Sequence, residues 1–176
     1  MSQEELLASL TPGTRERVEA LLSAAREKYG YELKIISARR SCAEQASIYA
    51  QGRTKPGNVV TNAKGCMSWH VLGRAVDLGW IRPTPPVADW DRLGALGESL
   101  GFVWGKYFKG LNDLPHFEYH PGVKIEQVCT NPDACEEGVA RSMGVTYGSI
   151  SSPDSVWPYV VGAAAVAAIA WVVWGD

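Results

Sequence analysis

Two metal-binding side chains beside an apolar run place the strongest constraint on this chain. His70 and Asp77 stand seven residues apart, and Gly73 between them allows the tight turn that would bring both to one ion. Residues 75–80 are apolar apart from Asp77 and are predicted to form a core strand. An unpaired buried carboxylate is strongly destabilising, so Asp77 is expected to face a cation. The alternative is a salt bridge to an arginine such as Arg74.

A second group of ionisable residues, Asp113, His116 and Glu118, lies about forty residues downstream. Two imidazoles and one carboxylate are the ligand set of a catalytic zinc site that keeps its fourth position open for water. His70, Asp77 and His116 are therefore the candidate Zn²⁺ ligands.

Residues 68–77 match the pattern S-x-H-x-x-G-x-A-x-D, through which the chain resembles the zinc D-Ala-D-Ala carboxypeptidase and L-alanyl-D-glutamate endopeptidase superfamily. Residues 36–45 are similar to the family element G-[YF]-R-[ST]-x-x-x-Q but differ at its Gly and aromatic positions. Residues 49–54 and 60–63 resemble the phage endolysin branch, so the likeness covers about residues 12–120. It implies a small hedgehog/D,D-peptidase-like α+β domain, in which helices flank an antiparallel sheet.

The resemblance also implies roles for other residues. Asp113 takes the family position three residues before the second histidine, where an acidic residue activates water as the general base. Arg40 takes the position of the arginine that contacts the substrate and stabilises charge on the attacked carbonyl, although the neighbouring Arg39 is an alternative. Gln45 and Ser68 match positions near the substrate, and for both a supporting role is favoured over a catalytic one.

Glu118 and His120 remain further candidates at the end of a predicted strand, residues 115–119. Side chains two residues apart in a strand share a face, so Glu118 could hold a histidine ligand or replace Asp113 as the base. His120 follows the strand and precedes a proline, and it is predicted not to be a ligand.

Periodicity, capping signals and glycines predict alternating helices and short strands, the order of a small α+β domain. Ser41 followed by Glu44 forms a capping-box pattern, and Gly30 is a natural helix stop. The predicted helices are 2–10, 14–29, 42–51 and 89–100, and the predicted strands are 33–37, 75–80, 102–104 and 115–119. Residues 59–62 are expected to form a short extended piece.

Composition divides the chain into a peptidase domain at residues 1–127, a Cys-, Asn-, Pro-, Ser- and Gly-containing linker at 128–155, and an uncharged segment at 156–174. As a helix, that segment would span roughly 28 Å, which is close to the hydrocarbon thickness of a bilayer. Aromatic residues at both of its ends also favour a transmembrane helix. The alternative is a buried C-terminal helix in an oligomer.

The remaining composition limits partners and location. A formal net charge of -2 with no basic tract gives no reason to expect nucleic acid. The N-terminus lacks the basic and apolar regions of a signal peptide, so membrane association is expected through residues 156–174 alone. Four cysteines allow two disulfides in three pairings or four free thiols, and the sequence does not choose among them. It also leaves the oligomeric state open.

These features together predict a zinc metallopeptidase that hydrolyses amide bonds in peptidoglycan stem peptides of the bacterial cell wall. An L-Ala-D-Glu endopeptidase is favoured over a D,D-carboxypeptidase by the endolysin-like stretches. The alternative is a non-catalytic, zinc-containing wall-binding module tethered to the membrane.

Overall fold

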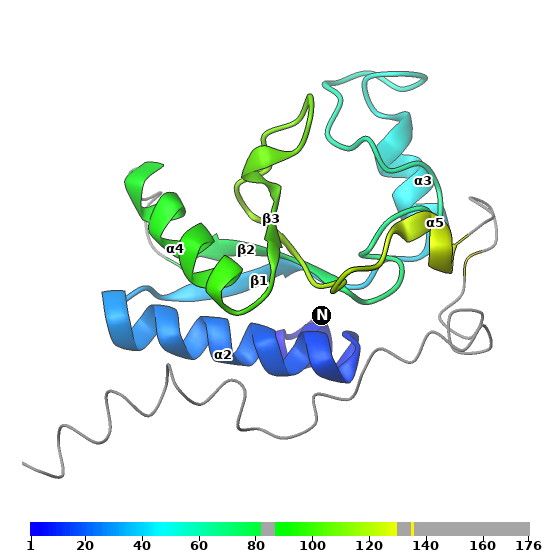
Figure 1. The fold of residues 1–176 in the computed structure, drawn as a ribbon. Coiled ribbons are helices and arrows are strands. Elements are labelled where there is room, and N and C mark those ends of the chain that lie inside the picture. The colour runs from blue at the N-terminus through cyan, green and yellow to red at the C-terminus, as the bar shows by residue number, and fades with distance from the viewer. Residues whose placement is uncertain (82–86, 130–134, 136–176) are drawn as a thin grey trace, which may run out of the picture. The chain divides into compact units, whose positions relative to one another are not determined.

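The computed structural model describes residues 1–81, 87–129 and 135. Within them, an antiparallel sheet of strand order β1-β2-β4-β3 packs against helices (Figure 1). The strands are β1 (Leu33–Ser37), β2 (Ala75–Trp80), β3 (Val103–Trp104) and β4 (His116–Glu118). The helices are α1 (Gln3–Ala8), α2 (Pro12–Tyr29), α3 (Cys42–Ala50), α4 (Val87–Ser99) and α5 (Ile125–Val128), with a 3-10 turn η1 at Gly105–Tyr107.

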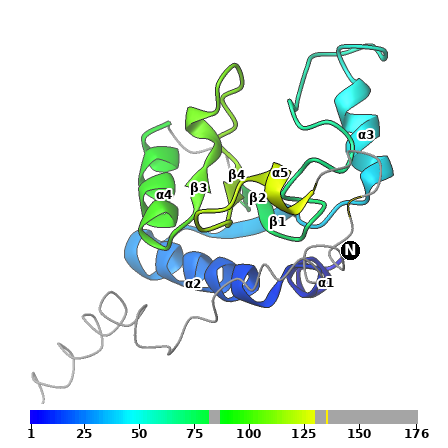
Figure 2. The same cartoon turned by 45° about the vertical axis from the view of Figure 1, so that its right-hand side comes forward.

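Helix α2 lies along one face of the sheet in both views of the fold (Figures 1 and 2). Its residues Val18, Leu21 and Ala25 are fully buried, and their spacing of three and four residues places them on one side of the helix. They belong to one core cluster with side chains from every strand of the sheet, which include Ile35, Val76, Leu78, Trp104 and Phe117.

Helix α4 approaches the sheet closely because it presents glycines at the contact. A Cβ atom on Gly94 would lie 2.1 Å from the Trp104 ring, and one on Gly97 would lie 2.6 Å from the Phe117 ring. Such separations are shorter than van der Waals contact, so only glycine fits at these positions.

Local signals in the sequence predicted most of these elements correctly. Gly30 ends α2 in the left-handed conformation, with a φ of 70°. Ser41 and Glu44 form the predicted capping box at the start of α3. The short extended piece expected at residues 59–62 pairs with no strand of the sheet and forms part of a loop. Helix α5 was not predicted.

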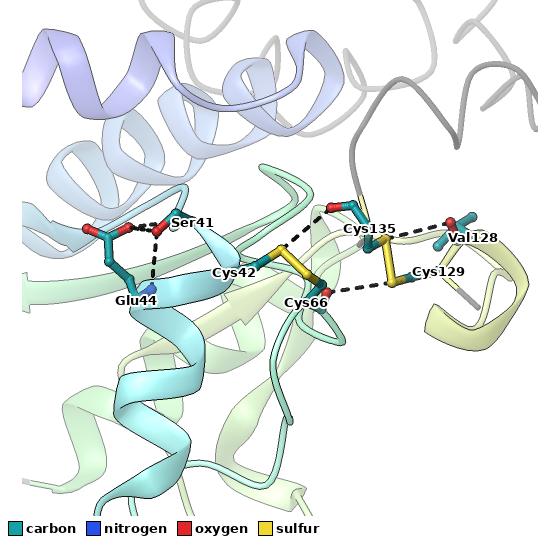
Figure 3. Close-up of a disulfide and its surroundings, with 7 residues drawn as sticks. All are labelled: Ser41, Cys42, Glu44, Cys66, Val128, Cys129 and Cys135. Carbon is teal, nitrogen blue, oxygen red and sulfur yellow. Dashed lines mark hydrogen bonds between the residues drawn. A yellow bond between two sulfur atoms is a disulfide. The ribbon is translucent and has the colours of Figure 1, made fainter. Parts of the chain in front are cut away.

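A second core cluster surrounds the cysteines, which form disulfides Cys42–Cys66 and Cys129–Cys135. Figure 3 shows the two disulfides side by side, and Cys42 Sγ lies 3.8 Å from the Cys135 carbonyl oxygen. The structure therefore selects one of the three pairings that the sequence allowed. The first disulfide joins the start of α3 to the loop before β2.

The predicted linker and membrane segment fall largely beyond the described residues. Val128, Cys129 and Cys135 are buried in the second cluster, so packed structure reaches past the predicted boundary at 127. The helix predicted at 156–174 lies outside the described residues and stays a prediction. Within the described ranges, no helix has both the length and the apolar character needed to cross a bilayer.

Candidate active site

Three atoms that could bind a metal ion converge beside the sheet and form what we call the ligand triangle: His70 Nε2, Asp77 Oδ1 and His116 Nδ1. The Nε2–Oδ1 and Nε2–Nδ1 distances are both 3.2 Å, and the Nδ1–Oδ1 distance is 3.1 Å. With bonds of about 2.0–2.1 Å, two ligands of a tetrahedral zinc ion lie about 3.3 Å apart. The ligand triangle therefore matches three corners of a tetrahedral zinc site.

The sheet and one loop position these three side chains. Asp77 and His116 are direct partners across β2 and β4, so the strand spacing fixes their separation. His70 lies in the loop before β2, where its Nδ1 is 2.6 Å from the Ala38 carbonyl oxygen. The Arg40 backbone N–H in turn donates to the His70 carbonyl at 3.2 Å, which ties this loop to the segment after β1.

The hydrogen-bond partners of His70 and His116 determine which ring nitrogen of each faces the centre of the ligand triangle. The Ala38 carbonyl can only accept, so His70 Nδ1 donates and the neutral ring keeps its lone pair on Nε2. His116 Nε2 donates to the Glu118 carboxylate at 2.9 Å, so the neutral form of this ring has its lone pair on Nδ1. These lone pairs and a carboxylate oxygen of Asp77 meet in a buried place, and this donor set fits a bound divalent cation such as zinc.

The electrostatics of the protein groups agree with a site built for positive charge. Burial alone would raise the pKa of Asp77, but the His70 and His116 rings outweigh it and hold that pKa far below its ordinary value. Burial alone would lower the pKa of His116, but its hydrogen bonds with Asp77 and Glu118 raise that pKa to about 9. The ligand triangle thus attracts a proton, which a metal ion has to displace.

Glu118 supports the site from behind. Its two oxygens accept hydrogen bonds from His116 Nε2 and His120 Nε2, each at 2.9 Å. Burial opposes the ionisation of Glu118, yet the bonds to both histidines outweigh it and lower its pKa. His120 stacks on Trp69 with ring centroids 4.4 Å apart and takes no part in the ligand triangle. Glu118 therefore orients the His116 ring, in the position that carboxylates commonly take behind metal-binding histidines.

Arg40 is the arginine that the structure places on Asp77, where the sequence had offered Arg74 as an alternative partner. Its Nη2 lies 2.5 Å from Asp77 Oδ2, the oxygen that faces away from the ligand triangle. Its Nη1 and Nε donate to Gln45 Oε1 and to Ser37 Oγ at 3.2 and 3.0 Å. Arg40 thus holds the carboxylate in place and also lines the cleft described below.

The other two predicted substrate-site residues differ in position. Gln45 is fully buried, and its Nε2 donates to the Ala63 carbonyl at 3.0 Å, so it braces the loop after α3. Ser68 lines the cleft, and its hydroxyl accepts the His70 backbone N–H at 3.3 Å. Both positions suit support of the site, and a direct contact with substrate stays a prediction for each.

Asp113 faces a cleft of about 470 Å³ that also exposes the ligand triangle. Burial and the charge of Asp77 raise the pKa of the Asp113 carboxyl. Its backbone N–H donates to the Gly105 carbonyl at 3.1 Å, which fixes the loop before β4. Within the described part of the chain, no side chain forms a hydrogen bond or ion pair with the Asp113 carboxylate. The carboxylate is therefore available to exchange a proton with a group in the cleft, whereas Glu118 is not.

Sequence reasoning missed several residues that line this cleft, among them Trp69, Phe108 and Lys109. The Phe108 ring lies over His116, with centroids 5.3 Å apart. Trp69 occupies a variable position of the signature, and the other two lie in a loop without periodicity. For Phe108 and Lys109, the only available signal was their position a few residues before Asp113.

Comparison with known proteins assigns the chain to a family. It is 34% identical over 127 residues to the peptidoglycan L-alanyl-D-glutamate endopeptidase CwlK of Bacillus subtilis (strain 168), covering 65% of this chain and 75% of that protein. A family model described as D-alanyl-D-alanine carboxypeptidase matches residues 61–119, which include the whole ligand triangle and Asp113.

Solved structures show a similar fold at low identity. The LdcB LD-carboxypeptidase matches with a TM-score of 0.50 and 18% identity, covering 76% of this chain and 63% of that one. The L-Ala D-Glu endopeptidase ChiX of Serratia marcescens has a TM-score of 0.48 and 19% identity, with coverages of 67% and 86%. From the extent of the match to CwlK, this chain belongs to the family of D-alanyl-D-alanine carboxypeptidases and L-alanyl-D-glutamate endopeptidases that act on peptidoglycan.

Proposed function

We propose that this protein is a zinc-dependent peptidase that cleaves amide bonds in peptidoglycan stem peptides, with the L-Ala-D-Glu bond as the preferred target. The observation that carries the proposal is the ligand triangle, with edges of 3.1–3.2 Å, in a cleft that also holds the uncommitted carboxylate of Asp113. The similarity to CwlK supports the endopeptidase over the carboxypeptidase. The finer likeness to the phage endolysin branch stays a prediction from sequence.

Different residues of the cleft would perform different steps of the hydrolysis. Bound zinc would polarise the attacked carbonyl and lower the pKa of water toward ~7. Asp113 accepts the proton of the attacking water, and its raised pKa brings it closer to the pH at which it has to give that proton to the leaving amine. Arg40 fixes Asp77, and its charge favours the negative charge that develops on the carbonyl oxygen.

Two variants test this assignment on purified peptidoglycan. Asp113→Asn should abolish product release, measured by mass spectrometry, while the bound zinc measured by elemental analysis stays near one ion per chain. Asp91→Asn is the matched control, because that carboxylate is exposed, pairs with Lys106 and does not line the cleft. A chelator should stop hydrolysis by the unmodified protein, and added zinc should restore it.

The same experiment separates an enzyme from a wall-binding module. A binding module would sediment with peptidoglycan and release no peptide, and Asp113→Asn would leave its binding unchanged. The half-buried Asp113 beside the ligand triangle favours the enzyme, because a binding module has no use for a carboxylate with a raised pKa. Full hydrolysis by Asp113→Asn would refute the assigned base.

A further inference from the structure

The cleft has a rim on which two loops meet, one after α3 and one between β3 and β4. Asn62 Nδ2 of the first loop donates to the Lys109 carbonyl of the second at 3.4 Å. The neighbouring residue, Phe108, lays its ring over His116, with centroids 5.3 Å apart. Adjacent Cα atoms are about 3.8 Å apart, so these contacts hold the Lys109 backbone near the ligand triangle.

Lys109 is a cation without a partner in this cleft. The described residues that line it include two histidines, which belong to the ligand triangle, and two residues with permanently positive side chains, Arg40 and Lys109. Arg40 is engaged by Ser37, Gln45 and Asp77. The Lys109 side chain is exposed, and within the described chain its ammonium makes no hydrogen bond or ion pair. Its flexible four-carbon stem lets the ammonium move toward a ligand in the cleft.

The proposed substrates present an anion at a fixed place. In both an L-Ala-D-Glu and a terminal D-Ala-D-Ala bond, the residue that supplies the leaving amine carries a free carboxylate on the carbon bonded to that amine. This carboxylate would enter a cleft that already contains Asp77, Asp113 and Glu118. Arg40 and two histidines already pair with Asp77 and Glu118, whereas the Asp113 carboxylate has no partner among the described residues. Like charges at close range repel, so an unpaired cation beside Asp113 would favour binding of this carboxylate.

We propose that Lys109 binds this α-carboxylate and makes the enzyme selective for substrates in which it is free. The inference rests on the proposed peptidase function and adds the part of the substrate that is recognised. In this proposal Lys109 determines which substrate binds, and Asp113 transfers the proton. A hydrogen-bonded contact of an ammonium with a carboxylate forms in the ground state as well as the transition state, so its loss should fall mainly on KM.

The test compares two synthetic stem peptides that differ at one group, the D-Glu α-carboxylate or its carboxamide. The zinc-loaded wild-type protein should prefer the carboxylate. Lys109→Gln should lower kcat/KM for the carboxylate peptide by about 10- to 100-fold, chiefly through KM, and leave the carboxamide peptide unchanged. Lys109→Arg should restore most of the preference, because it restores the charge.

Lys64→Gln is the matched control, since Lys64 is exposed and does not line the cleft. It removes the same charge and should keep the wild-type preference. Hydrolysis of both peptides by the wild type without preference would overturn the role of Lys109 and leave the peptidase function standing. An equal loss on both peptides in Lys109→Gln would also overturn it. Hydrolysis of neither peptide by the zinc-loaded wild type would refute the peptidase function itself, and this proposal with it.

Discussion

Replacing Glu118 by Gln should weaken zinc binding without removing a ligand. Glu118 accepts from two ring nitrogens, His116 Nε2 and His120 Nε2, at 2.9 Å each. A glutamine has one acceptor and one donor group, so it can accept from only one of the two rings. Where its NH₂ group faces His116, that ring has to accept at Nε2 and carry its proton on Nδ1, the atom of the ligand triangle.

The magnitude follows from the type of contact that is lost. Removing the carboxylate behind a metal-bound histidine typically costs 10- to 100-fold in metal affinity, or about 1.4 to 2.8 kcal/mol. The side chain of Glu118 is only 12% exposed, so water does not readily replace it. We expect Glu118→Gln to fall within this range.

The measurement is a competition titration of metal-free protein against a zinc indicator of known affinity. Glu126→Gln is the control, because this exposed residue of α5 changes the charge equally and lies outside the cleft. Zinc affinity of Glu118→Gln within twofold of the unmodified protein would show that Glu118 does not set the His116 tautomer.

Four further predictions follow from the structure. Since the pKa of His116 is raised to about 9, zinc binding at pH 7 should release close to one proton from this ring, and fewer above pH 9, as calorimetry in buffers of different ionisation enthalpy would show. Phe117→Ala should lower the free energy of unfolding by about 3–5 kcal/mol in a urea titration, because this ring is fully buried between α4 and the sheet. Reducing the Cys42–Cys66 disulfide, whose residues are 24 apart in sequence, should cost about 3 kcal/mol in the same titration. Deleting residues 156–174 should move the protein from the membrane pellet to the supernatant after cell fractionation, and an unchanged distribution would count against the predicted anchor.

Local chemistry made much of the fold predictable from sequence. Gly30, Ser41 and Glu44 act through their own backbone neighbourhood, so the ends of two helices could be placed. The extended piece around Val59 and Val60 did not become a strand, because strand formation depends on more than the local sequence. These side chains are 42% and 41% exposed, and a β-branched pair forms a strand only where a partner strand is available.

The gathering of the three candidate ligands was predictable from sequence, as was a place for Glu118 beside a histidine, whereas other contacts of the site were not. His70 and Asp77 were visible from their spacing around a glycine, and the structure gathers them with His116, while their binding of a metal stays a prediction. Whether Asp77 pairs with Arg40 or with Arg74 depends on sheet register and loop direction, which spacing does not specify. The cysteine pairing and the place of Lys109 likewise depend on long-range contacts that carry no motif.

Asp77 and His116 are register partners on β2 and β4, so their relative position is set by the sheet and not by the segment that connects the two strands. Backbone hydrogen bonds between the strands fix the separation of these two residues, so the long segment between β2 and β4 can gain or lose residues without changing that separation. The segment between β2 and β4 contains α4 and the loop with Lys109 and Asp113. If the proposed site is correct, a peptidase built this way could exchange the segment that contacts its substrate and still hold Asp77 and His116 at the same separation.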